Sequence, residues 1–134
     1  MNIEKIQELV DLSKIARDNA YVPESKFPVG AAILTKKGVF TGGNIENSSY
    51  SLCMCAERTA LFAAVNAGCR KGDFIGIAVI ANTPNRIVPC GACLQTLSEF
   101  VAKDMPVVLA NKDGHFVEHQ FKDLLPIVFD INDV

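Results

Sequence analysis

The sequence has no apolar run long enough to cross a bilayer. Its longest uncharged stretches are residues 74–85 and 87–98, 12 residues each, whereas a membrane-spanning helix needs about 20. An apolar leader is missing as well, because Glu4 and Lys5 stand where a secretory signal peptide needs an apolar segment. We therefore expect a cytoplasmic protein whose thiols stay reduced.

An excess of positive charge is also absent. Thirteen Lys and Arg residues face 15 Asp and Glu, the net charge is -2 and the pI is about 5.6. Proteins that bind nucleic acid usually carry a basic stripe, and none is present here. We expect a small, neutral substrate and neither a nucleic-acid nor a membrane partner. Internal repeats and low-complexity stretches are lacking too, so 134 residues that are 49% apolar predict one domain over residues 1–134.

The cysteines do not suit a disulfide framework. There are five of them, at positions 53, 55, 69, 90 and 93, and an odd number in a reducing compartment favours metal binding or catalysis instead.

The apolar pattern changes repeatedly between a helical period and short strand-like runs. This alternation predicts an α/β fold of about five strands with helices on both faces. We expect helices over residues 3–20, 56–67, 91–102 and 122–125, and strands over residues 29–35, 39–42, 74–80, 106–110 and 114–118.

Two short segments carry the candidate chemistry, Cys55-Ala-Glu57 and Pro89-Cys-Gly-Ala-Cys93. Each places cysteine in the first turn of an expected helix, where free backbone N–H groups and the helix dipole favour a thiolate. The spacing of Cys90 and Cys93 is common for two ligands of a tetrahedral zinc, and Cys55 would be the third. Three protein ligands leave the fourth position for water, as in catalytic sites, and Glu57 is placed to move protons there.

These segments resemble the zinc-dependent cytidine deaminases, specifically the small homotetrameric type with three cysteine ligands. Residues 25–32, 44–47, 50–61 and 124–126 look like further family segments in family order. The resemblance implies a three-layer α/β/α sandwich with a mixed sheet of about five strands and one Zn²⁺ per chain. It also implies hydrolytic deamination of cytidine and deoxycytidine, as in pyrimidine salvage, by a zinc-activated water with a glutamate proton shuttle.

The same resemblance assigns roles to individual residues. Glu57 matches the proton shuttle, and Arg58 matches an arginine that hydrogen-bonds the ligand sulfurs. The remaining matches are Cys55, Cys90 and Cys93 as zinc ligands, Phe27 and the Ala56 backbone at the base, Asn44 and Glu46 at the ribose 3′-hydroxyl, and Tyr50 and Phe129, which complete a neighbouring subunit's pocket.

The chain departs from the family pattern at Leu94, where arginine is common. The zinc ligands are untouched, but three thiolates on one divalent ion leave a charge of about -1, and one cation that would offset it is missing. Glu24 and Ile127 also depart from the pattern, without a clear functional meaning.

Several other interpretations stay open. The Cys90–Cys93 pair could be a thioredoxin-like redox pair. Alternatively, Cys53 or Cys69 could complete a structural four-cysteine zinc site in a binding module. We expect Cys53 and Cys69 instead to be small buried apolar residues. His115 and His119 match a zinc-peptidase pattern that requires a helix, whereas the segment alternates like a strand. An enzyme for another cytosine nucleoside, or an editor of polynucleotides, would use the same core motif.

Overall fold

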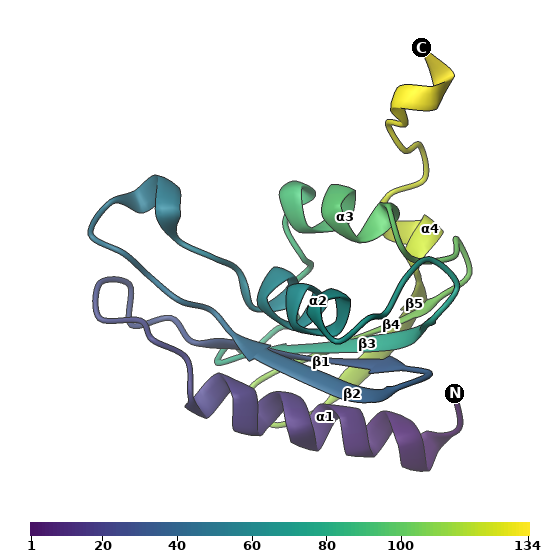
Figure 1. Cartoon of the computed structure of the whole chain (residues 1–134). Helices are drawn as coiled ribbons and strands as arrows, with labels where there is room; N and C mark the ends of the chain where they lie inside the picture. Colours follow the sequence, from purple (N-terminus) through teal and green to yellow (C-terminus); the bar gives the residue numbers. More distant parts are fainter.

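The computed structural model describes residues 1–134, and a five-stranded mixed sheet forms its centre (Figure 1). The strand order is β2-β1-β3-β4-β5. Only β3 and β4 are parallel, and every other neighbouring pair is antiparallel. The strands are β1 (Val29–Thr35), β2 (Gly38–Gly43), β3 (Phe74–Ala81), β4 (Pro106–Ala110) and β5 (Phe116–Gln120).

Helices cover both faces of this sheet. Helix α1 (Ile3–Asp18) lies along one face, while α2 (Ala56–Asn66) and α3 (Gly91–Ser98) lie on the other (Figure 1). A short α4 (Phe121–Leu124) follows β5, and two 3-10 helices span Tyr50–Leu52 and Ile131–Asp133. The expected three-layer α/β/α architecture is confirmed. None of the helices combines the length and the apolar character that a membrane crossing needs.

The strand pleat divides the core into two parts. Ile77 and Val79 of β3 belong to the larger cluster beneath α2 and α3, whereas Ala78 and Ile80 belong to the smaller one beneath α1. Successive side chains of a strand point to opposite faces, so a strand covered on both sides must be apolar throughout. This explains the nearly continuous apolar run of β3.

Glycines bring the helices close to the sheet. A Cβ on Gly42 would lie 2.6 Å from the Ala60 nitrogen of α2, and a Cβ on Gly30 would collide with the Ser13 carbonyl oxygen of α1. Contacts this short leave no space for a side chain. The approach at Gly42 sets the position of α2, whose N-cap is Cys55 and whose first turn carries Glu57.

Three elements differ from the expected bounds by two residues or more, and the other differences are of one residue. Helix α1 ends at Asp18. Helix α3 ends at Ser98, after which the Phe100 N–H bonds the Leu97 carbonyl three residues earlier, in a turn tighter than that of an α-helix. Strand β5 starts two residues late. The Asn111 side chain accepts the N–H groups of Asp113 and His115 at 3.0 Å each, which closes a turn over the first residues of the expected strand.

Candidate metal centre and adjoining pocket

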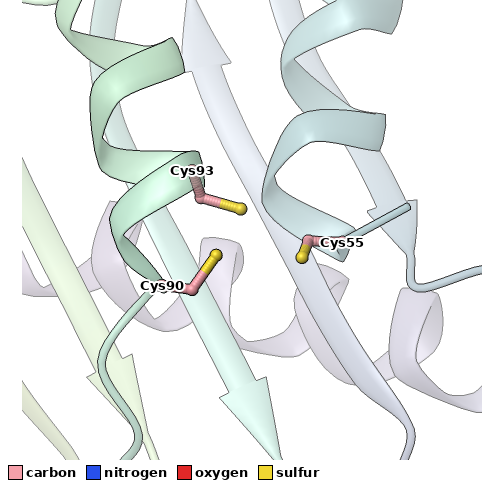
Figure 2. A group of neighbouring side chains, drawn as sticks. All are labelled: Cys55, Cys90 and Cys93. Atoms are coloured by element: carbon pink, nitrogen blue, oxygen red, sulfur yellow. The ribbon is translucent and has the colours of Figure 1, made fainter. Parts of the chain in front are cut away.

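Three cysteine sulfurs converge at the starts of α2 and α3. Cys55 is the N-cap of α2, Cys90 is the N-cap of α3, and Cys93 lies in the first turn of α3. Figure 2 shows the three side chains pointing toward one another, and their Sγ atoms all lie within 4.8 Å of each other. No other group of His, Cys, Asp or Glu side chains in the chain forms such a cluster.

The helix starts act on the charge of these thiols. Burial opposes ionisation of Cys90, but the N–H groups of Cys93 and Ala92, together with the neighbouring thiols, outweigh it and lower its pKa. At Cys93, burial and the nearby negative groups Glu57 and Cys55 raise the pKa. A cation bound beside Cys90 and Cys93 would favour the ionised form of both thiols.

The donor set fits zinc. Thiolate sulfur is a preferred zinc ligand, and tetrahedral geometry with Zn–S bonds of about 2.3 Å requires sulfurs about 3.8 Å apart, within the 4.8 Å limit of this cluster. A bound dication would also remove the mutual repulsion of the thiolates. With three protein ligands, the fourth position stays available to water.

Arg58 is the only cationic side chain that hydrogen-bonds the cluster. Its Nη2 donates to Cys55 Sγ at 3.5 Å, and hydrogen bonds to Cys55 and Cys93 raise the pKa of its guanidinium. Leu94 offers no second cation: it is buried and packs into the core beneath α3. Arg58 therefore faces the cluster's negative charge alone.

Glu57 is a buried carboxylate beside the sulfurs. It is only 5% exposed, and burial raises its pKa, while its own backbone N–H, Cys93 and Arg58 oppose that shift. It lines a cavity together with Cys55 and Cys90. A carboxyl group whose pKa is shifted toward neutrality is suited to accepting and returning a proton.

The cavity beside the sulfurs has a volume of about 260 Å³ and is mostly apolar. Of the residues matched to the base and ribose, it holds Phe27, Asn44 and Ala56. Sequence reasoning missed Val29, Ile87 and Val88; the apolar pair directly before Pro89-Cys90 was the available signal. The lining consists of Phe27, Val29, Asn44, Cys55, Ala56, Glu57, Ile87, Val88 and Cys90.

Asn44 and Glu46 both contact the segment between α1 and β1. Asn44 Oδ1 accepts the Val29 N–H at 2.8 Å, and its Nδ2 donates to the Phe27 carbonyl at 3.0 Å. Glu46 accepts two N–H groups of the turn that precedes Phe27, and these bonds, led by those from Ser25, lower the pKa of its carboxyl group. Glu46 lies outside the cavity lining.

Tyr50 and Phe129 lie away from this chain's own cavity. They are 77% and 63% exposed and are not among its lining residues. The C-terminal segment that carries Phe129 extends away from the body (Figure 1), and Gln95 Nε2 donates to the Phe129 carbonyl at 3.0 Å. A larger hollow of about 390 Å³ near this segment holds none of the matched residues.

The remaining cysteines and the histidine pair do not join the centre. Cys69 is buried in the core, as expected, whereas Cys53 is only half-buried and accepts the Asn47 N–H at 3.3 Å; here the expectation of a buried apolar residue is wrong. His119 lies in β5 and His115 just before it, so no helix presents the peptidase pattern.

Comparison with known proteins places these features in context. The family model for the cytidine and deoxycytidylate deaminase zinc-binding region matches residues 3–109. The cytidine deaminase of Sporosarcina psychrophila is 48% identical over 96% of this chain and 94% of its own length. The probable cytidine deaminase of Dictyostelium discoideum is 41% identical over 100% of this chain and 90% of its own length. The crystal structure of cytidine deaminase from Burkholderia pseudomallei superposes with a TM-score of 0.88 at 48% identity, covering 96% of this chain and 100% of that one.

Proposed function

The chain belongs to the zinc-dependent cytidine deaminase family, and from this we propose that it hydrolyses cytidine and deoxycytidine with Glu57 as the proton carrier. Deamination of cytidine and the use of zinc follow from the family itself. The observation that carries the residue assignment is the placement of Glu57 on the cavity wall beside three converging cysteines. In the overall reaction, cytidine and water give uridine and ammonia.

The chain's own residues account for the proton movements. When bound, zinc supplies a water that is acidic enough to act as a nucleophile at neutral pH. Glu57 accepts a proton from the attacking water and returns it to N3 of the base. It then takes the water's second proton from the new hydroxyl on C4 and delivers it to the amino group, so that the bond between C4 and the amino nitrogen breaks, ammonia leaves and the C4 carbonyl forms. Burial of Glu57 supports this role, because it moves the pKa of the carboxyl group toward the working pH.

The nucleoside contacts are proposed on the cavity and its edges. The Phe27 ring forms a wall against the base, and the Ala56 backbone contacts the base edge. Asn44 and Glu46 hold the ribose 3′-hydroxyl. Because this contact uses the 3′ rather than the 2′ position, deoxycytidine is expected to be a substrate as well; turnover of ribosides only would contradict the assignment.

The first experiment follows the ultraviolet absorbance of cytidine with zinc-loaded protein and with the Glu57→Gln variant. We expect the wild type to remove the cytidine band and the variant to be slower by at least about 100-fold, with one zinc per chain in both. A variant as active as the wild type would exclude the shuttle role. A wild type that holds zinc but leaves cytidine unchanged would point to a structural zinc site or to another cytosine nucleoside.

We further propose a homotetramer in which Tyr50 and Phe129 complete a neighbour's pocket. Their exposure and their distance from this chain's own cavity support the idea. The three ligand thiols must stay reduced to bind metal, which favours activity in the cytoplasm. Conversion of cytosine nucleosides to uracil nucleosides there would serve pyrimidine salvage.

A further inference from the structure

The segment between α1 and β1 brings Phe27 to the pocket without being packed into the domain. Residues 23–27 are all exposed, and Tyr21 makes only an isolated bridge to Ile45. Phe27 lines the cavity and yet remains 38% exposed. Apolar burial therefore contributes little to holding this segment, and hydrogen bonds determine where the Phe27 ring lies.

Ser25 stands between Glu46 and Phe27 in these hydrogen bonds. One Glu46 oxygen accepts the backbone N–H groups of Glu24 and Ser25 at 2.9 and 3.0 Å. On its other side, Ser25 Oγ accepts the Phe27 N–H at 3.0 Å. Ser25 therefore contacts Glu46 through its backbone N–H and Phe27 through its side chain.

The backbone next to Ser25 needs this support. Lys26 has a φ of 58°, in the left-handed region that non-glycine residues occupy only where their surroundings hold them. Asn44 Nδ2 fixes the next carbonyl, that of Phe27, at 3.0 Å. Both polar groups of the Phe27 backbone are thus held, the carbonyl by Asn44 and the N–H by Ser25.

We propose that Ser25 is a positioning residue that links the Glu46 carboxylate to the Phe27 backbone. Its backbone N–H donates to Glu46, and its hydroxyl oxygen accepts the Phe27 N–H. The group assigned to the sugar then also sets the wall against which the base lies. Ser25 itself touches no substrate. The inference rests on the proposed function, since it takes Phe27 and Glu46 as nucleoside contacts, but the link between the three residues can be measured without substrate.

The test compares Ser25→Ala with Ser25→Thr, which keeps a hydroxyl, and with Glu24→Ala. The Glu24 variant is the matched control, because it shortens a neighbouring exposed side chain that makes no hydrogen bond or ion pair. Amide hydrogen exchange at Phe27 is measured in the zinc-loaded protein without substrate. Steady-state kcat and KM for cytidine are measured on the same samples.

For Ser25→Ala, we expect the Phe27 amide to exchange about 5- to 10-fold faster, as loss of one hydrogen bond implies. The KM for cytidine should rise about 3- to 10-fold while kcat stays within about 2-fold. Ser25→Thr should restore both values, and Glu24→Ala should leave both unchanged. Adding Ser25→Ala to Glu46→Ala should change Phe27 exchange little, because the link is already broken at its other end.

If the Phe27 amide exchanges at the same rate in Ser25→Ala as in the wild type, the proposed link between Ser25 and Phe27 is wrong. Faster exchange with an unchanged KM would overturn the positioning role, as would a threonine variant that behaves like the alanine variant. If the wild type fails to deaminate cytidine, the proposed function fails instead, and the exchange measurement still decides whether Ser25 holds Phe27.

Discussion

Arg58 faces the negative charge of the metal centre without help from another cation. Its guanidinium bonds Cys55, while the position where arginine is common holds the buried Leu94. A hydrogen-bond donor to a metal ligand orients that ligand and, when cationic, offsets its charge. We therefore expect this single side chain to influence metal retention more than a surface arginine would.

Replacement of Arg58 by alanine should weaken zinc binding by about 10- to 100-fold, the range usual for groups that orient metal ligands. Competition with a chromogenic chelator measures this directly. Arg58→Lys, which keeps the charge but has a shorter reach, should fall between the alanine variant and the wild type. Equal zinc affinity in all three proteins would show that the ligands need no cation.

The carboxyl group of Glu46 should make the hydrogen bonds of the turn before Phe27 depend on pH. Hydrogen bonds from Ser25 and Glu24 lower the pKa of its carboxyl group from the ordinary 4.5. A lowered pKa in the folded state means that the contribution to stability is present above 4.5 and is lost as the pH falls through the folded value. The amide resonances of Glu24 and Ser25 should therefore titrate with a midpoint below 4.5, and Glu46→Gln should abolish the titration. A midpoint at or above 4.5 would contradict the hydrogen-bonded carboxylate.

At the scale of single residues, the sequence predicts the metal ligands better than it predicts the residues that line the cavity. Cys55, Cys90 and Cys93 could be placed together because helix starts have known geometry and the spacing suits a metal. Ile87 and Val88 could not be assigned to the cavity, because the sequence pattern around an apolar loop residue does not differ between one that lines a pocket and one that packs into the core. Ser25 lay inside a recognised segment, but only the fold shows what its hydroxyl contacts.

At the scale of elements, the close approach of α1 to β1 can be tested by substitution of Gly30. Gly30→Ala would push a Cβ onto the Ser13 carbonyl oxygen of α1, and forcing such an atom into a packed interface costs about 1–3 kcal/mol or more. Urea denaturation of the zinc-loaded protein should show this loss in the free energy of unfolding. The control is Gly91→Ala, whose Cβ would meet nothing within 4 Å. Equal stability of the two variants would mean that α1 can move off the sheet cheaply.

The strands and helices themselves were largely predictable from the sequence. Strands β1 and β4 have the expected bounds, because apolar runs ending at turns define them well. The expected start of β5 is two residues too early. The turn before it depends on the Asn111 side chain accepting two backbone N–H groups, and the apolar periodicity carries no sign of these bonds. The early end of α3 likewise coincides with a local turn, in which the Phe100 N–H bonds the Leu97 carbonyl, and periodicity does not contain this turn.

At the scale of the whole molecule, the proposed homotetramer predicts that two inactive variants restore each other's activity. If Phe129 completes a neighbour's pocket as proposed, Phe129→Ala should lose activity by removing part of that pocket, and Glu57→Gln by removing the proposed proton carrier of its own pocket. Mixed tetramers, formed by denaturing and refolding the two together, contain some sites with both residues intact. Activity of the mixture well above that of either parent is expected, and a mixture no more active than its parents would show that each chain completes its own site.

The cysteine centre also ties together distant parts of the chain. Cys55 begins α2 and Cys90 begins α3, with β3 between them in sequence, so an ion held by both closes a long loop and stabilises the folded over the unfolded polypeptide. Loss of metal then weakens the structure as well as the chemistry, and partly unfolded chains are removed by cellular proteases. In a zinc-poor cell, the abundance of this protein should decline together with its activity, so that the supply of a trace metal would limit how much cytidine is converted to uridine.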